Sequence, residues 1–203
     1  MDQSGVRIAA AVVVVAALAV GIWFWQRPAP IAPGILFVGD SVTYMSAGQL
    51  DEEMRSEDPR VLARIGFKSA DMLPLLEEDV ARREKQGQLK QVAILLGYND
   101  VLQHQPDSPA LGEVMALADR FDCAVWLTLP EVPLREREVT LWNQRVEDAA
   151  RSYRHVHVVD DWRDAVNEAP AGELVQRKDG VHPTAAGARR LSEIYTEAVH
   201  RVC

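Results

Sequence analysis

The chain has little cysteine and no excess of basic residues. Its 203 residues include two cysteines, Cys123 and Cys203, which are too few for a disulfide framework or a cysteine zinc site. Free thiols and one bond between the two both stay open, and the spacing gives no argument for the bond. Lys and Arg number 22 against 30 Asp and Glu, a net charge of −8. Nucleic acid is therefore not expected as a partner, because no basic surface is available to neutralise phosphates.

Internal repeats and low-complexity tracts are also lacking, apart from one Val/Ala-rich run near the N-terminus. Ile8 to Trp25 is eighteen residues long and carries no charge. As a helix it would span about 27 Å, close to the hydrocarbon thickness of a bilayer. It ends in three aromatic residues, typical of a lipid headgroup boundary, and no clean small-x-small cleavage site follows it. We therefore predict an uncleaved N-terminal transmembrane helix, residues 1–27, in preference to a signal peptide or a buried core helix.

A short spacer and an acidic domain are predicted to follow this anchor. Residues 28–34 contain Pro28, Pro30 and Pro33, a composition that favours an extended linker. Without residues 1–33 the chain carries 20 basic and 29 acidic residues, a net charge of −9. The short N-terminal tail favours an inside start. The domain, residues 35–203, is thus expected to be membrane-anchored and extracytoplasmic, in the cell envelope.

From Ile35 onward, short apolar runs alternate with longer amphipathic segments. The runs predict strands near Ile35–Val38, Val61–Ile65, Val92–Leu96, Ala124–Thr128 and Val156–Val159. Helices are expected after Ser41 and at Ala70–Lys85, Ala110–Phe121, Glu138–Tyr153 and Ala185–Val202, with Ser69 as an N-cap. This alternation predicts an α/β fold in which helices cover both faces of a five-stranded parallel sheet.

Chemically useful side chains follow the predicted strands, at the edge where open parallel sheets bind ligands. The segments are Gly39-Asp40-Ser41, Gly66, Gly97-Tyr98-Asn99-Asp100 and Asp179-Gly180-Val181-His182. A serine hydroxyl needs a base to become a nucleophile, and His182 can serve Ser41 in that way. Asp179, three residues earlier, can hold the imidazole in the required tautomer. The residues thus predict a catalytic triad.

An oxyanion hole is predicted beside this triad. The backbone N–H groups of Ser41 and Gly66 and the side-chain amide of Asn99 can donate to a developing oxyanion. No metal or cofactor is expected: His155 and His157 share one face of a strand, but no third ligand has suitable spacing.

These four blocks, in this order, resemble the signature blocks of the SGNH (GDSL-type) hydrolase superfamily. The resemblance covers Ile35 to Val202 and implies a flavodoxin-like α/β/α domain, with the roles above at positions 41, 66, 99 and 182. Members of the superfamily are esterases, lipases, thioesterases, carbohydrate deacetylases and some acyltransferases. Val42 stands where the namesake motif has leucine, and the Gly-x-Ser-x-Gly elbow of α/β-hydrolases is absent.

We therefore predict a serine esterase that acts through an acyl-Ser41 intermediate on a small-molecule, glycan or lipid ester. Two alternatives stay open: an acyltransferase of the same fold, and a non-catalytic domain that binds a glycan or a protein partner. Asp40 and Asp100 are interpreted as residues that fix loops, and three tryptophans, Trp126, Trp142 and Trp162, as core. The rim of the substrate site is predicted at Tyr98, Val101, Leu102, Pro130, Val132 and Pro133.

Overall fold

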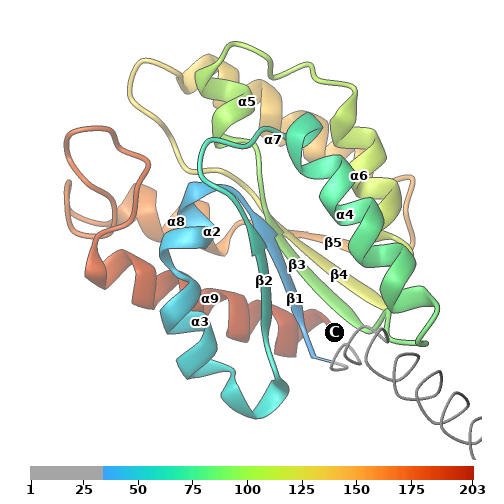
Figure 1. Cartoon of the computed structure of the whole chain (residues 1–203). Helices are drawn as coiled ribbons and strands as arrows, with labels where there is room; N and C mark the ends of the chain where they lie inside the picture. The colour runs from blue at the N-terminus through green and yellow to red at the C-terminus, as the bar shows by residue number, and fades with distance from the viewer. Residues whose placement is uncertain (1–33) are drawn as a thin grey trace, which may run out of the picture. The chain divides into compact units, whose positions relative to one another are not determined.

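The computed structural model describes residues 34–203. Five parallel strands form one sheet in the order β2-β1-β3-β4-β5 (Figure 1). They are β1 (Leu36–Gly39), β2 (Arg60–Ala63), β3 (Gln91–Leu95), β4 (Cys123–Leu127) and β5 (Val156–Val159). This is the flavodoxin-like order, whose ligand-binding switch point lies between β1 and β3. Gly39 and Leu95 are partners in the register there, so the segments that follow them emerge side by side.

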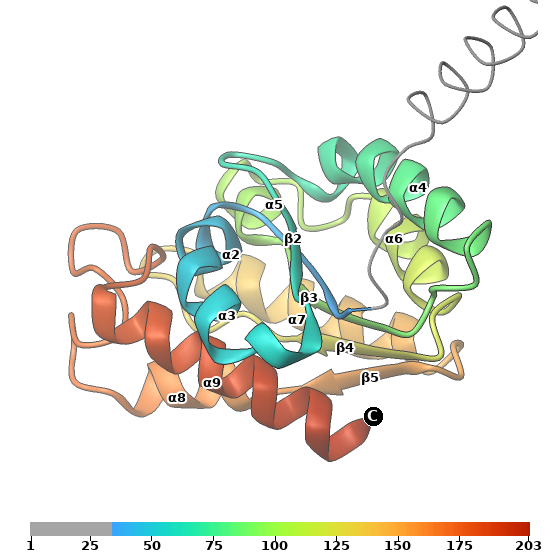
Figure 2. The same cartoon turned by 60° about the horizontal axis from the view of Figure 1, so that its bottom comes forward.

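Helices cover both faces of the sheet (Figures 1 and 2). On one face lie α4 (Ser69–Glu84), α5 (Tyr98–Leu102), α6 (Ala110–Ala118) and α7 (Glu136–Ala150). On the other lie α2 (Ser41–Met45), α3 (Ala47–Glu53), α8 (Asp161–Glu168) and α9 (Ala185–Val202), with the 3-10 turn η1 (Arg55–Glu57) after α3. The α/β/α layering and the parallel sheet predicted from the sequence are confirmed.

The core explains why the central strands are apolar along their whole length. Every residue of β1 and β4 is buried, as parallel strands with helices on both faces require. Trp126, Trp142 and Trp162 are fully buried, which confirms their assignment to the core. The Trp162 indole N–H also donates to the Tyr98 hydroxyl at 3.0 Å.

Two helices and one cap differ from the prediction made from the sequence. The helices α5 and α8 were not predicted, because α5 is only five residues long and α8 buries a single residue, Trp162. Ser69 is the first residue of α4 rather than its N-cap. Its backbone N–H and hydroxyl instead donate to Asp100 at 3.0 and 3.1 Å, which fastens the start of α4 to α5.

A disulfide joins Cys123 to Cys203, which decides between the two alternatives that the sequence left open. It connects the first residue of β4 with the residue after α9, across a sequence separation of 80. The covalent link lies at the amino ends of the strands, opposite the edge that carries Ser41.

The predicted membrane helix, residues 1–27, lies outside the described residues, as does the spacer up to residue 33. Within residues 34–203, no helix combines the length and the apolar character needed to cross a bilayer.

Candidate active site

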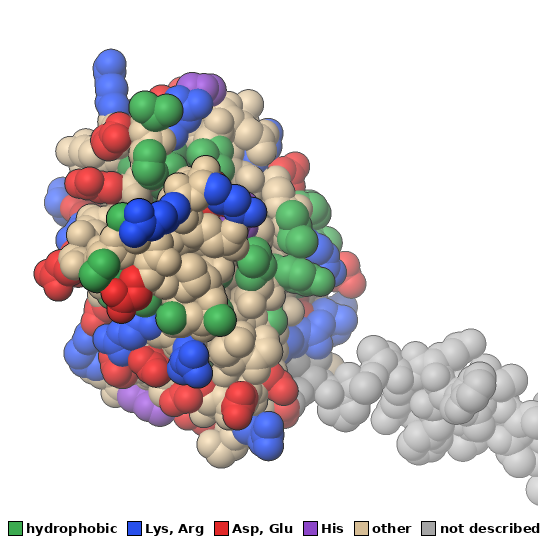
Figure 3. All heavy atoms as spheres, turned by 90° about the vertical axis from the view of Figure 1, so that its left-hand side faces the viewer, with side chains coloured by type: hydrophobic (Ala, Val, Ile, Leu, Met, Phe, Trp, Pro, Cys, Tyr) green, Lys and Arg blue, Asp and Glu red, His purple; other side chains and the backbone are tan. Residues whose placement is uncertain are grey.

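The carboxyl ends of the strands bring the sequence-predicted segments to one edge of the domain. Ser41 begins α2 directly after β1, the Gly66 turn follows β2, and Asn99 lies in the first turn of α5 after β3. The loop before α9 carries Asp179 and His182. Figure 3 views the domain from the side on which α2 and this loop lie, and shows hydrophobic side chains spread among charged ones.

Ser41, His182 and Asp179 form a continuous chain of polar contacts. The Ser41 Oγ lies 3.1 Å from His182 Nε2, and His182 Nδ1 lies 3.0 Å from Asp179 Oδ2. With the proton on Nδ1, Nε2 faces the hydroxyl as a free base, which is the geometry that activates a serine. Ser41 and His182 come from positions 141 residues apart, so the tertiary fold is needed to assemble the pair.

Asp179 is held ionised by the turn that contains it. Partial burial acts to raise the pKa of this carboxyl, but hydrogen bonds from the backbone N–H groups of Val181 and His182, both 2.9 Å, and the His182 side chain outweigh it. The pKa is therefore lowered. Gly180 adopts φ +65°, and an added Cβ there would lie 2.5 Å from Pro133. Only glycine fits this turn without displacing the loop after β4.

The groups that could hold an oxyanion are tied to one another. Gly66 adopts φ +79°, yet an added Cβ would meet no atom within 4 Å. Glycine is thus needed for the backbone conformation rather than for the close approach of a neighbouring group. The Asn99 amide donates to the Phe67 carbonyl at 3.0 Å. One amide hydrogen therefore fixes the Gly66 turn, and the second remains available to a ligand.

Two buried carboxyl groups fix the backbone under Ser41, as interpreted from the sequence. Asp40 caps α2 by accepting the Val42 N–H at 3.0 Å, and Asp100 holds Ser69. Burial raises the pKa of Asp40 to about 7; the hydrogen bond from Val42 opposes this shift and the Asp100 carboxylate adds to it. The pKa of Asp100 is also raised, again chiefly by burial. Asp40 Oδ2 and Asp100 Oδ1 are both buried without a hydrogen-bond partner.

Most of the predicted substrate rim is interior. Tyr98, Val101 and Val132 are at most 1% exposed, and Pro130 is also buried. These four were wrong as rim residues, because the segments after β3 and β4 turn back onto α7 and α8. Leu102 is at the surface, 37% exposed, and so is Pro133.

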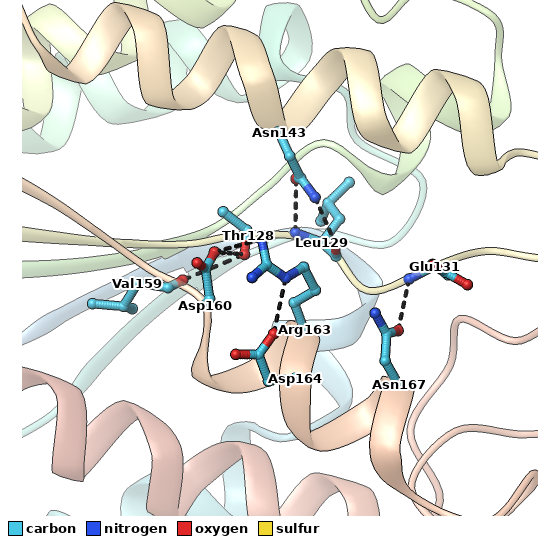
Figure 4. A network of polar contacts seen from close by, with 9 residues as sticks. All are labelled: Thr128, Leu129, Glu131, Asn143, Val159, Asp160, Arg163, Asp164 and Asn167. Carbon is cyan, nitrogen blue, oxygen red and sulfur yellow. Dashed lines mark hydrogen bonds and ion pairs between the residues drawn. The ribbon is translucent and has the colours of Figure 1, made fainter.

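The loop after β4 is fixed by side chains of α7 and α8 (Figure 4). Asn143 accepts the Leu129 N–H at 2.9 Å and donates to the Leu129 carbonyl at 2.8 Å. Further along, Asn167 accepts the Glu131 N–H at 3.0 Å. These contacts set the path of the loop up to Pro133, which abuts the Asp179 turn.

An open pocket of about 530 Å³ lies on the outer side of this loop. Its lining includes Glu131, Asn167, Gln176, Arg177 and Gly180, but neither Ser41 nor His182. Its lining residue Gly180 directly follows Asp179 of the triad.

A model of the GDSL-like lipase/acylhydrolase family matches residues 37–190. The chain belongs to this family. The SGNH superfamily suggested by the four sequence blocks is thereby confirmed, and the family supports a hydrolase. The match begins in β1 and ends within α9, so it includes every element that carries the site. No curated protein matches the chain.

Solved structures of other proteins share the fold of this chain. A GDSL-like lipase from Bacteroides thetaiotaomicron is 19% identical, with a TM-score of 0.67, over 87% of this chain and 93% of that one. The esterase EstA from Pseudoalteromonas sp. is 17% identical, with a TM-score of 0.62, over 83% and 97%. The catalytic domain of peptidoglycan O-acetyltransferase A from Streptococcus pneumoniae is 17% identical, with a TM-score of 0.62, over 85% and 96%. At these identities the likeness concerns the fold alone.

Proposed function

We propose that this family member is a serine esterase that cleaves a carboxylic ester through an acyl-Ser41 intermediate. The observation that carries the proposal is the chain of contacts from Ser41 Oγ to His182 Nε2, 3.1 Å, and from His182 Nδ1 to Asp179 Oδ2, 3.0 Å. Because the pKa of Asp179 is lowered, its carboxylate keeps a negative charge beside the imidazole of His182.

In this mechanism Ser41 Oγ attacks the ester carbonyl carbon while its proton passes to His182 Nε2. The developing oxyanion accepts hydrogen bonds from the Ser41 and Gly66 N–H groups and from Asn99 Nδ2. The C–O bond to the alcohol then breaks, and the imidazolium returns the proton to the leaving oxygen. Water repeats the sequence on the acyl enzyme, which releases the acid and restores Ser41.

A fluorophosphonate probe tests the nucleophile without knowledge of the substrate. The full-length protein and its Ser41→Ala variant are exposed to the probe, and intact mass is measured. We expect one adduct on the wild type and none on the variant. Absence of an adduct on the folded wild type would contradict the esterase and favour a non-catalytic binding domain.

Transfer to an acceptor hydroxyl is the second candidate. The likeness in fold between this chain and the catalytic domain of a peptidoglycan O-acetyltransferase supports this candidate. Addition of sugars or alcohols to an ester assay separates the two reactions. A transferase yields a new acylated product and faster ester turnover, whereas a hydrolase yields only the free acid.

We further propose that the domain works outside the cytoplasm, anchored by residues 1–27. The Cys123–Cys203 disulfide supports this location, because disulfides form and persist in oxidising compartments. Fusion of a reporter that is active only outside the cytoplasm to the C-terminus tests it. An inactive reporter on an expressed fusion would contradict the orientation.

A further inference from the structure

Most of the large exposed hydrophobic side chains follow the carboxyl ends of strands, at the edge of the sheet that carries Ser41. Among residues 34–203 they are Tyr44, Met45, Ile65, Leu102, Leu134 and Leu141. All but Leu141 lie in the segments that follow β1 to β4. Apolar side chains that are exposed at such an edge are candidates for a binding surface.

Tyr44 and Met45 lie on the same face of α2 as Ser41. They are three and four residues after it, the spacing at which helical side chains are neighbours, about 5–6 Å apart at Cβ. Helical side chains also lean toward the N-terminus, and in α2 that is toward Ser41. Tyr44 is 50% exposed and Met45 43%. The opposite face of the helix is sealed in the core by Val42, Thr43 and Ser46.

Ile65 extends this apolar face on the neighbouring segment. It is 66% exposed and directly precedes Gly66, where an added Cβ would meet no atom within 4 Å. Helix α2 packs against β2, and Ile65 lies two residues beyond the end of that strand. We define Tyr44, Met45 and Ile65 as the apolar shelf.

We propose that the apolar shelf binds the acyl chain of the ester and makes the enzyme prefer longer acyl groups over acetyl groups. The proposal rests on the proposed esterase and adds its substrate class. An acyl group bonded to Ser41 Oγ cannot pass through the buried face of α2, so its chain has to leave across the exposed face. The exposed side chains of that face are Tyr44 and Met45.

The test compares kcat/KM for p-nitrophenyl hexanoate and p-nitrophenyl acetate in the full-length protein. Complete burial of a methylene favours binding about fourfold, and an open shelf buries each one in part. We expect the wild type to prefer hexanoate by about tenfold, and Met45→Ser or Ile65→Ser to lower this ratio about threefold or more. Tyr44→Ser is expected to act in the same direction.

Leu141→Ser is the matched control. Leu141 is 41% exposed, close to the value for Met45, but it lies on α7, which covers the face of the sheet opposite to α2. We expect this variant to keep the wild-type ratio. Circular-dichroism melting confirms that each variant is folded, and the ratio of two substrates cancels any loss of active enzyme.

The outcomes distinguish the shelf from the proposed function. If Ser41-dependent hydrolysis of both esters persists with the same ratio in all three shelf variants, the shelf does not bind the acyl chain and this inference is overturned. An unchanged ratio with a dimer that the shelf substitutions dissociate, or with vesicle binding that they abolish, would assign the surface to a second copy or to lipid, and also overturns it. Lack of Ser41-dependent hydrolysis of either ester contradicts the esterase itself.

Discussion

At the scale of single residues, the two oxygens of Asp179 have different roles. Oδ1 accepts the backbone N–H groups that hold the turn, and Oδ2 orients the His182 ring. In Asp179→Asn one side-chain oxygen remains and can still accept the Val181 and His182 N–H groups, so the turn is retained. The other atom becomes an amide donor, which opposes a proton on His182 Nδ1. We expect kcat to fall by about 10⁴-fold with an unchanged melting temperature. Full activity in the variant would show that another carboxylate orients His182.

Asn99→Ala removes a donor from the predicted oxyanion hole. We expect kcat to fall by about 10²–10³-fold, while the lost hydrogen bond to the Phe67 carbonyl lowers the free energy of unfolding by about 1 kcal/mol. Steady-state kinetics and urea denaturation measure the two effects separately. An unchanged kcat would exclude Asn99 from the hole and leave it only the structural bond to Phe67.

Asp40 makes stability depend on pH in the direction opposite to that of most carboxyl groups. Its pKa is about 7 in the folded chain against an ordinary 3.8, so between these values the folded state holds a proton that the unfolded state has lost. Stability from this group is complete below pH 3.8 and declines as the pH rises through 7, by about 4 kcal/mol in total. Asp40→Asn keeps the acceptor for the Val42 N–H but cannot ionise.

We therefore expect the free energy of unfolding of Asp40→Asn to exceed that of the wild type by an amount that grows from pH 5 to pH 9. Urea denaturation of both proteins across that range measures the difference, and comparison of the pair cancels the titration of the other groups. Parallel profiles would show that Asp40 is charged in the folded protein.

The residues of the candidate triad could be found from the sequence, because histidine is scarce, with five in the chain, and one of them stands three residues after an aspartate in the loop that follows the last predicted strand. The predicted rim failed for a physical reason. Position after a strand indicates the edge of the sheet but not the direction of the side chain, and Tyr98 turns inward to meet Trp162. The apolar shelf could have been found, since Tyr44 and Met45 stand at helical spacing from Ser41.

At the scale of elements, the sheet was predictable because its strands are short, mostly apolar runs, and the central strands β1 and β4 are buried along their whole length. The helix α8 was not, because it is only eight residues long and Trp162 is its only buried residue. Polar contacts hold such segments in place: Thr128 at the end of β4 donates to Asp160 before α8 at 2.7 Å. Long-range pairs of this kind leave no pattern in the local sequence.

Asn143 shows how one helix fixes the loop beside the triad. Asn143→Ala leaves the Leu129 N–H and carbonyl without their buried partner, and we expect the free energy of unfolding to fall by about 2–3 kcal/mol. Because the loop up to Pro133 supports the Asp179 turn, kcat should fall as well. Chemical denaturation and ester kinetics measure both effects.

Asn167→Ala is the control, because it removes one hydrogen bond from an exposed stretch of the same loop. It should lower the free energy of unfolding by less than half as much as Asn143→Ala. Equal losses would contradict a special role for the buried pair.

At the scale of the whole molecule, the disulfide ties the last helix to the centre of the sheet. Helix α9 packs against β3 and β4 and directly follows the segment that carries His182. A bond that fixes α9 therefore also restrains the segment around His182. A bond that closes a loop of 80 residues restricts the unfolded chain by about 4 kcal/mol in the loop-entropy model. We expect Cys203→Ser to lower the free energy of unfolding by roughly that amount.

Because Cys123 lies at the amino end of β4, opposite Ser41, the same variant should keep kcat at temperatures where it is folded. Urea denaturation with and without reductant, together with ester kinetics, measures both quantities. The reduced wild type should match Cys203→Ser, and the double variant with Cys123→Ser should be no less stable than Cys203→Ser alone. A loss of kcat in the folded variant would mean that the amino edge of the sheet and the triad are coupled through α9, and the bond would then have to be treated as part of the site rather than as a tether.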